Sequence, residues 1–348
     1  MRSRLNRSRT ADVKVSRTSI VYGPIISWRL GRSLGIDLIL PPKTCTFDCI
    51  YCQLGRTVNK VSSPRDFKPK VYLDDLVREL KAVLEGMDIR FLDHVTFSGC
   101  GEPTLHPGLG EMIEAVKDLC PSVPVAILTN SSLFWLGEVV EAVRNADVIV
   151  AKLDAALPDI FSLVNRPAEG VELDMVIDGL KEVRKTAKGR LAIQSMFLKA
   201  HGKPINTDET SLSRLVEVLR STRPDQVQVN TPTRPPAEPY VEALSPEELK
   251  AIADYLSCQL RDIEVISWHS PRLGPVRKRA GELRKALIAI LERRPCRFHE
   301  LCLSTGEEPI MVRAELDRLI SEGLLVVRDY KGQRFYVLKG GEAGIKCV

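Results

Sequence analysis

The chain has 348 residues, of which 27% are charged and 44% are apolar, and its formal net charge at pH 7 is +5. This composition is typical of a soluble globular protein and excludes a collagenous or largely disordered chain. No apolar run approaches the roughly 18 residues that span a membrane, so we expect no membrane partner and a cytoplasmic location.

Basic charge is concentrated at the two ends of the chain. Residues 1–17 hold six basic residues and one acidic residue, without the hydrophobic stretch of a secretory signal. Residues 272–340 hold fifteen basic and nine acidic residues, 341–348 are neutral, and 18–271 therefore carry a net charge of −6. This pattern is either ordinary surface variation or that of an enzyme core with segments that bind polyanions. We divide the chain into a basic tail (1–17), a core (18–271), a small domain (272–340) and a short tail (341–348).

The core alternates between apolar and amphipathic runs. Strands are predicted over 35–39, 94–98, 125–129, 148–153, 191–198, 226–230 and 264–267. Helices are predicted over 73–84, 109–119, 136–144, 173–187, 208–220 and 246–260, with Asp208 and Ser245 as N-caps. The strands are nearly continuously apolar, which indicates a parallel sheet covered on both faces. Six main strands favour an α/β fold of the partial (β/α)6 barrel type.

Three cysteines follow the first predicted strand within eight residues: Cys45, Cys49 and Cys52. A loop lets three thiolates converge on one metal centre, and a four-iron cluster held by three thiolates leaves one iron without a protein ligand. Such an open position takes an exchangeable ligand. The alternative is a structural zinc site completed by a distant histidine such as His94. The odd total of nine cysteines, without an export signal, favours reduced thiols or metal ligands over disulfides.

A glycine-rich segment follows the second strand and contains Gly99, Gly101 and Glu102. Glycines let the backbone approach a ligand closely, and the carboxylate can pair with an ammonium group. The alternative is a turn that starts a helix. We interpret Cys100 as a small packed residue and not as a fourth metal ligand. The remaining cysteines are too scattered to form a second cluster: Cys100, Cys120, Cys258, Cys296, Cys302 and Cys347.

The C-x3-C-x2-C spacing, with Tyr51 just before the last cysteine, resembles the radical S-adenosylmethionine (radical SAM) superfamily over about residues 20–268. The resemblance implies a [4Fe-4S] cluster on the three cysteines, SAM on the open iron, and an electron donor of the flavodoxin or ferredoxin type. Reduction would cleave SAM to methionine and a 5′-deoxyadenosyl radical, which abstracts a hydrogen atom from the substrate. The SAM contacts implied near the two motifs are Tyr51, Gly99, Gly101 and Glu102.

Polar residues at the ends of later strands are expected to complete the SAM site, because ligands bind at the carboxyl ends of parallel strands. These residues are Asn130, Asp154 and Gln194, and each is equally explained as a loop cap. Lys152 is costly to bury alone, so we expect it to meet Asp154 or a substrate carboxylate. No residue is assigned a catalytic role toward the substrate.

The segments YGPI (22–25), RLGRSLG (29–35) and QLGRT (53–57) resemble an uncharacterised radical SAM branch that is grouped with the tRNA wyosine synthases. The resemblance suggests an RNA substrate. Wyosine synthases use an additional N-terminal cysteine set, whereas here no cysteine precedes Cys45, so wyosine synthesis itself is not expected. Arg29 and Arg32 serve either the fold or a substrate anion.

After residue 282 the pattern changes to helices over 282–293, 298–303 and 309–321 and strands over 324–330 and 334–338, which resembles a winged helix. Such a domain binds nucleic acid, binds a peptide by strand pairing, or serves as an accessory or dimerisation unit. A non-enzymatic iron–sulfur regulator is a further alternative. The basic residues expected to contact phosphates are Arg277, Lys278, Arg279, Arg284, Lys285, Arg293, Arg294, Arg313, Arg318, Lys331 and Arg334.

Overall fold

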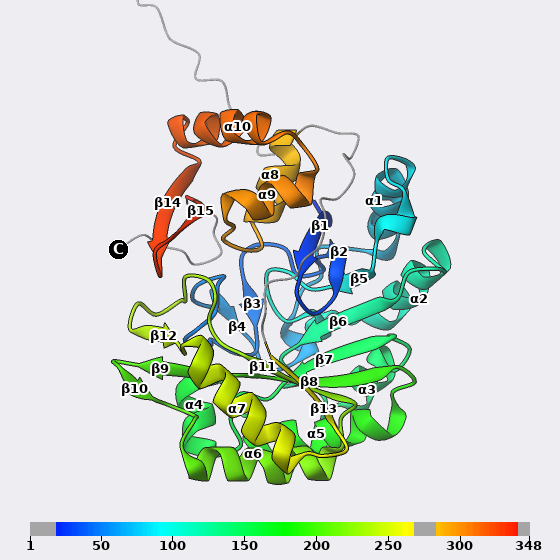
Figure 1. Ribbon diagram of the computed structural model, residues 1–348. Coiled ribbons are helices and arrows are strands. Elements are labelled where there is room, and N and C mark those ends of the chain that lie inside the picture. The colour runs from blue at the N-terminus through cyan, green and yellow to red at the C-terminus, as the bar shows by residue number, and fades with distance from the viewer. Residues whose placement is uncertain (1–18, 268–282, 340–348) are drawn as a thin grey trace, which may run out of the picture.

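The structure is a computed structural model that describes residues 19–267 and 283–339 (Figure 1). The predicted tails, the boundary at 271 and 272, residues 277–279 and Cys347 lie outside these ranges. Within them, no helix is both long enough and apolar enough to cross a membrane.

The centre of the described chain is one eight-stranded sheet in the order β1-β2-β5-β6-β7-β8-β11-β13. Neighbours from β2 to β13 are parallel, and β1 runs antiparallel to β2. The strands are β1 (Val21–Ser27), β2 (Gly31–Ile36), β5 (His94–Phe97), β6 (Val125–Thr129), β7 (Val148–Lys152), β8 (Arg190–Met196), β11 (Gln226–Asn230) and β13 (Glu264–Ser267). The parallel sheet confirms the predicted α/β class and is consistent with a partial barrel.

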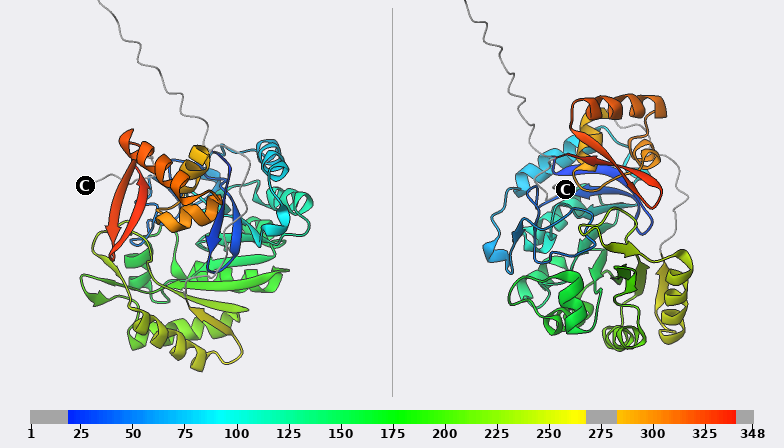
Figure 2. Two further views of the ribbon diagram at one scale, coloured as in Figure 1. Left: turned by 45° about the horizontal axis from the view of Figure 1, so that its top comes forward. Right: turned by 90° about the vertical axis from the view of Figure 1, so that its left-hand side faces the viewer.

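Helices between the strands wrap the outside of the sheet (Figures 1 and 2). They are α1 (Leu73–Glu85), α2 (Leu109–Leu119), α3 (Gly137–Val143), α4 (Pro158–Asn165), α5 (Leu173–Thr186), α6 (Glu209–Thr222) and α7 (Pro246–Gln259), with short 3-10 turns at Pro64–Asp66, Ile89–Phe91 and Pro103–Leu105. The predicted N-caps are confirmed, since Asp208 accepts from the Ser211 amide at 3.0 Å and Ser245 forms a capping box with Glu248. One large apolar core joins these helices to the sheet.

The first predicted strand is displaced. β2 ends at Ile36, because the Asp37 carboxylate accepts from the amides of Ile39 and Leu40 at 3.0 and 3.2 Å and turns the chain. β1 was not expected, since Gly23 and Pro24 interrupt its apolar run, and the ladder shifts register there. The predicted strand over 191–198 is divided between β8 and a small sheet of β9 (Leu198–Ala200), β10 (Lys203–Pro204) and β12 (Val241–Ala243).

The C-terminal elements occur in the predicted order: α8 (Leu283–Leu291), α9 (Phe298–Thr305), α10 (Pro309–Ser321), β14 (Leu325–Tyr330) and β15 (Gln333–Leu338). Tyr22 and Ile25 of β1 share one apolar cluster with Leu287 and Ile290 of α8 and Leu301 of α9. The C-terminal helices therefore pack directly on the edge strand of the sheet, above β1 and β2 in Figure 1.

Candidate metal centre

The cysteine loop lies at the carboxyl ends of the parallel strands and contains two short strands, β3 (Thr44–Cys45) and β4 (Asn59–Lys60). Its far side is fixed to the end of α4. The amide of Asp48 donates to the carbonyl of Asn165 at 3.0 Å, and the amide of Ile50 donates to that of Val164 at 3.0 Å. Each of these bonds anchors the backbone close to Cys49.

Each cysteine sulfur of the triplet receives its own side-chain N–H donor. Lys43 Nζ lies 3.2 Å from the Cys52 sulfur, Asn130 Nδ2 lies 3.4 Å from Cys45, and Asn165 Nδ2 lies 3.5 Å from Cys49. All three cysteines are free. Such donors stabilise thiolates, which are the form that binds metal. Of the three donors only Asn130 was among the predicted site residues, and it was predicted as a SAM contact. Lys43 lies two residues before Cys45, where no spacing signal singles it out, and Asn165 comes from a helix that was not predicted.

A single zinc ion would need three or more ligands close together. In the part of the chain that the structure describes, no three His, Cys, Asp or Glu side chains lie close enough to hold one metal ion. A four-iron cluster differs, since each thiolate binds its own iron and the sulfurs stay apart. Three free thiols, each beside an N–H donor, are the number of ligands that leaves one iron of a four-iron cluster open.

Burial dominates the acid–base state of these thiols. It raises the pKa of Cys45 to about 11 and, together with the Asp154 carboxylate, that of Cys49 to about 12. Lys43 is itself almost completely buried, and its ammonium also donates to the carbonyl of Gly55 at 2.7 Å. Burial lowers the pKa of Lys43, but the neighbouring cysteine sulfurs raise it more, so the net shift is upward. The site thus combines thiols that need a cation to ionise with one buried cation.

The glycine segment packs on the cysteine loop. A Cβ on Gly101 would lie 1.8 Å from the carbonyl oxygen of Thr44, and the amide of Glu102 donates to that oxygen at 3.1 Å. A Cβ on Gly99 would lie 2.0 Å from the Asp37 carboxyl group. These glycines therefore permit close approach of two protein segments, in addition to any ligand. Cys100 is fully buried, as expected for a packed residue.

Glu102 is buried, and its carboxylate accepts four hydrogen bonds from the protein. The donors are the Thr104 amide (3.1 Å) and hydroxyl (2.7 Å), the Thr129 hydroxyl (2.7 Å) and the Asn130 amide (2.7 Å). Burial raises its pKa although these bonds lower it. The carboxylate ties the glycine segment to the end of β6, a role that the sequence did not indicate.

Asp154 organises the other side of the site. Its carboxylate accepts from the Tyr51 hydroxyl at 2.5 Å, Asn165 Nδ2 at 2.7 Å and the Met196 amide at 3.0 Å. Lys152 lies 3.1 Å from the same carboxylate, which confirms the expected pair, and 5.0 Å from the centre of the Tyr51 ring. The structure thus joins Tyr51 and Asp154 in one network. Gln194 belongs to it through Lys152, at 3.5 Å.

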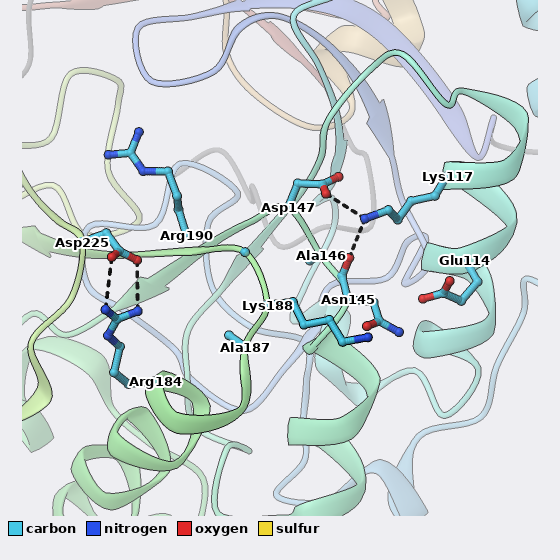
Figure 3. A pocket seen from close by; sticks show the side chains of 11 residues that line it. Glu114, Lys117, Asn145, Ala146, Asp147, Arg184, Ala187, Lys188, Arg190 and Asp225 are labelled. Carbon is cyan, nitrogen blue, oxygen red and sulfur yellow. Dashed lines mark hydrogen bonds and ion pairs between the residues drawn. The ribbon is translucent and has the colours of Figure 1, made fainter.

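A depression of about 660 Å³ lies elsewhere, beside the first residues of β7 and β8 (Figure 3). Its charges are largely paired within the protein: Lys117 lies 2.7 Å from Asp147, and Arg184 lies 3.2 Å from Asp225. It faces the amino ends of the strands, whereas the cysteine loop lies at their carboxyl ends. We assign it no role in the chemistry.

Several C-terminal arginines that were expected to contact phosphates are engaged within the protein. Arg293 is buried against Asp37 at 3.1 Å. Arg284 pairs with Glu315 at 3.1 Å, and Arg318 pairs with the same carboxylate at 3.0 Å. Arg313 lies 4.0 Å above the Phe298 ring and donates to the Tyr336 hydroxyl at 2.5 Å. Arg294 differs from these four, because its Nε and Nη2 are shielded from solvent and have no hydrogen-bond partner.

The chain is similar to several known proteins. Residues 39–199 match the Radical SAM superfamily model. UPF0026 protein MJ1312 of Methanocaldococcus jannaschii is 31% identical over 324 residues, which cover 92% of this chain and 96% of that protein. A Brachyspira hyodysenteriae protein named GTPase Obg is 33% identical over 321 residues, and the match covers 92% of this chain but only 45% of that protein. The crystal structure of Streptococcus suis SuiB bound to S-adenosylmethionine aligns with a TM-score of 0.49 at 15% identity, covering 67% of this chain and 50% of that one.

Proposed function

The chain belongs to the UPF0026 family and is a radical SAM enzyme that uses a [4Fe-4S] cluster and SAM, and from this premise we propose that Cys45, Cys49 and Cys52 hold the cluster. The observation that carries the proposal is the set of three free thiols, each with its own N–H donor. A cluster held by these cysteines would supply the electron for reductive cleavage of SAM to methionine and a 5′-deoxyadenosyl radical, and hydrogen abstraction from the substrate would follow. The electron comes from a donor of the flavodoxin or ferredoxin type.

We propose that SAM lies between the glycine segment and the Asp154 network. The residues proposed to line its site are Tyr51, Gly99, Gly101, Glu102, Asn130, Asp154 and Gln194. Glu102 and Asp154 already accept several hydrogen bonds from the protein, so we propose that their main role is to fix the positions of the segments around the SAM site. Because such a site is ordered before SAM binds, little of the binding free energy is lost in ordering its side chains.

The test is anaerobic reconstitution followed by measurement of iron and of 5′-deoxyadenosine. We expect about four irons per chain, as a [4Fe-4S] cluster requires. 5′-Deoxyadenosine should form when a strong reductant and SAM are present. Cys45→Ala, Cys49→Ala and Cys52→Ala should each abolish that product, whereas Cys258→Ala, at an exposed cysteine, should retain it. A protein that binds one zinc and no iron would refute the assignment.

For the substrate we propose RNA, with tRNA as the first candidate. Support comes from the basic charge at both ends of an acidic core and from the likeness to the wyosine synthase group. Binding should then be largely electrostatic and should weaken steeply with salt. Titration of full-length protein with tRNA at low and moderate salt tests this, and absence of binding at low salt excludes it.

A peptide substrate is the second candidate, and one observation favours it. Among the described strands, β14 has a ladder partner, β15, on one edge and none on the other, and Val327 of β14 is 43% exposed. An extended peptide can add to such an edge by backbone hydrogen bonds. Identification of the RNA or peptide that copurifies with the protein under anaerobic conditions separates the two candidates.

A further inference from the structure

We infer that Arg29, Arg234 and Arg294 form a binding site for a phosphate group, where the C-terminal helices meet the barrel. Arg29 lies in the turn between β1 and β2, Arg234 lies in the segment after β11, and Arg294 lies in the connection between α8 and α9. Phosphate binding here does not depend on the function proposed above. Only the assignment of the phosphate to an RNA substrate rests on it.

The first observation is a set of buried N–H groups that have no acceptor. Nε and Nη2 of Arg294 are both shielded from solvent, and neither has a hydrogen-bond partner. These two groups lie on one edge of the guanidinium, the edge that binds two oxygens of an oxyanion side by side. Nε of Arg29 is likewise shielded and unpaired. An unsatisfied buried donor is costly, so a ligand is expected to satisfy these groups.

The second observation is an excess of positive charge. Arg234 donates to Glu300 at 2.7 and 3.1 Å and to the carbonyl of Pro295 at 2.9 Å. Glu300 also pairs with Arg297, at 3.3 Å. In the ranges that the structure describes, Arg29 and Arg294 have no carboxylate partner. The four arginines thus have one carboxylate among them in the described ion pairs, that of Glu300, and it pairs with Arg234 and Arg297.

The positive charges of Arg29, Arg234 and Arg294 are close enough to affect the pKa of Arg29. Burial, and then the neighbouring charges of Arg294 and Arg234, lower the pKa of Arg29 to about 10. Buried arginines elsewhere in this chain have a carboxylate, as Arg293 has Asp37 at 3.1 Å. Glu300 is the carboxylate of this cluster, and it balances only part of the positive charge. Positive charge that is shielded from water and incompletely balanced is unfavourable, so the cluster is suited to an anion.

Phosphate suits the cluster better than a carboxylate does. A phosphate ester carries one to two negative charges and three or four oxygens, which can meet more than one guanidinium at once. Arginine is the side chain best suited to such planar, two-point recognition. The phosphate comes either from an RNA backbone or from a small phosphorylated molecule.

The experiment uses the full chain and inorganic phosphate as the probe. We measure the thermal unfolding midpoint and the phosphate affinity by calorimetry, against sodium chloride of equal ionic strength. Phosphate should raise the midpoint of the wild type. Arg29→Gln and Arg294→Gln should each weaken phosphate binding about tenfold or more, as loss of a charge-assisted hydrogen bond predicts. Arg284→Gln is the control, since that arginine is paired with Glu315 and Glu322.

Two results would overturn the site: no effect of phosphate on the wild type, or equal phosphate affinity in the wild type and both variants. Each variant removes a charge that has no ion-pair partner among the described residues, so its unfolding midpoint without phosphate should not fall. A loss of phosphate binding can then be distinguished from misfolding. Adenosine monophosphate and a short RNA are then tested as competitors. Competition by RNA assigns the phosphate to a nucleic-acid backbone, and competition by the nucleotide alone assigns it to a small molecule. Failure of SAM cleavage would leave these results unaffected.

Discussion

At the scale of single residues, buried charges with several partners hold the candidate site together. Asp37 accepts from the amides of Ile39, Leu40 and Cys100 and from Arg293 Nε at 3.1 Å. One carboxylate thus joins the end of β2, the glycine segment and the C-terminal segment. Lys43 has a comparable position beside Cys52, where its charge is shielded from water.

Substitution of Lys43 tests whether its charge affects the reduction potential of the proposed cluster. A fixed positive charge that donates to a ligating sulfur favours the reduced, more negative state. Lys43→Met should therefore make the reduction potential more negative by roughly 60 mV, the one-electron equivalent of about 1.4 kcal/mol. Redox titration followed by electron paramagnetic resonance measures the shift.

Lys60→Met is the matched control for that measurement, because Lys60 lies on β4 of the same loop and donates to the backbone carbonyls of Arg166 and Pro167. Iron content should remain complete in both variants. An unchanged potential in a fully loaded Lys43→Met protein would show that the ammonium serves only to fold the loop.

The pair of Arg234 and Glu300 predicts a pH dependence of stability. Burial raises the pKa of the Glu300 carboxyl, but Arg234, Arg294 and Arg297 together lower it more, so the net shift is well below the usual value. A carboxylate with a lowered folded pKa stabilises the protein above its unfolded pKa, about 4.3, and this contribution is lost as the pH falls. Glu300→Gln should cost about 3 kcal/mol of unfolding free energy at pH 7.

Urea unfolding across a pH series checks this prediction. The difference between the wild type and Glu300→Gln should shrink as the pH falls below about 4.3. Glu141→Gln is the control, since its pair with Arg144 is exposed and should contribute less than about 1 kcal/mol. A constant difference at every pH would contradict the role of the ion pair.

At the scale of elements, the cysteine loop depends on segments that approach it closely. Thr44 of β3 bridges to Gly101, and the amide of Thr44 donates to the carbonyl of Cys100 at 3.2 Å. On the other side, Phe47 stacks edge-on against Phe161 of α4, with ring centres 5.4 Å apart. The loop is thus held between the glycine segment and α4.

Gly101→Ala should disturb this packing, because its Cβ would fall 1.8 Å from the backbone oxygen of Thr44, which cannot move as a side chain can. We expect a loss of about 1–3 kcal/mol of unfolding free energy and reduced iron loading. Gly137→Ala, at the start of α3 with nothing within 4 Å of the added Cβ, should be neutral or stabilising by about 0.4–1 kcal/mol. Equal stability of the two variants would show that the segments do not need this contact.

At the scale of the whole molecule, the C-terminal segment is joined to the site. Arg293 is 3% exposed and contacts Asp37, the carbonyl of Ser19 at 2.5 Å and the face of Tyr22. Asp37 in turn accepts from the amide of Cys100 at 3.1 Å, inside the glycine segment. Removal of the C-terminal segment would therefore also remove the arginine that pairs with Asp37 beside the glycine segment.

Arg293→Met should leave the Asp37 carboxylate without its counter-charge and should reduce the unfolding free energy by about 3 kcal/mol. We also expect weaker SAM binding by the reconstituted enzyme, because Asp37, which accepts from the amide of Cys100, loses one of the contacts that hold it in place. Equilibrium dialysis with labelled SAM measures this, and Arg284→Met serves as the control. If stability falls while SAM affinity is unchanged, the C-terminal segment supports the fold alone.

The sequence by itself determined the features that depend on neighbours along the chain. Apolar periodicity predicted the parallel strands and most helices, and it also predicted the order of the C-terminal elements. The spacing of Cys45, Cys49 and Cys52 and the glycines before Glu102 pointed to the chemistry. These signals are local, because helix and strand periodicity and short ligand spacings each extend over only a few to about fifteen residues of the chain.

Only the tertiary structure decided which distant groups meet. Arg293 finds Asp37 across 256 positions, and Asn165 reaches Cys49 across 116. From charge composition alone, Arg293 was predicted to contact phosphate, although Arg293 is buried in an ion pair with Asp37. Composition also could not distinguish Arg293 from Arg294, whose Nε and Nη2 donors have no acceptor. Whether a charged side chain is paired depends on contacts made when separate elements pack together, and no spacing along the chain records those contacts.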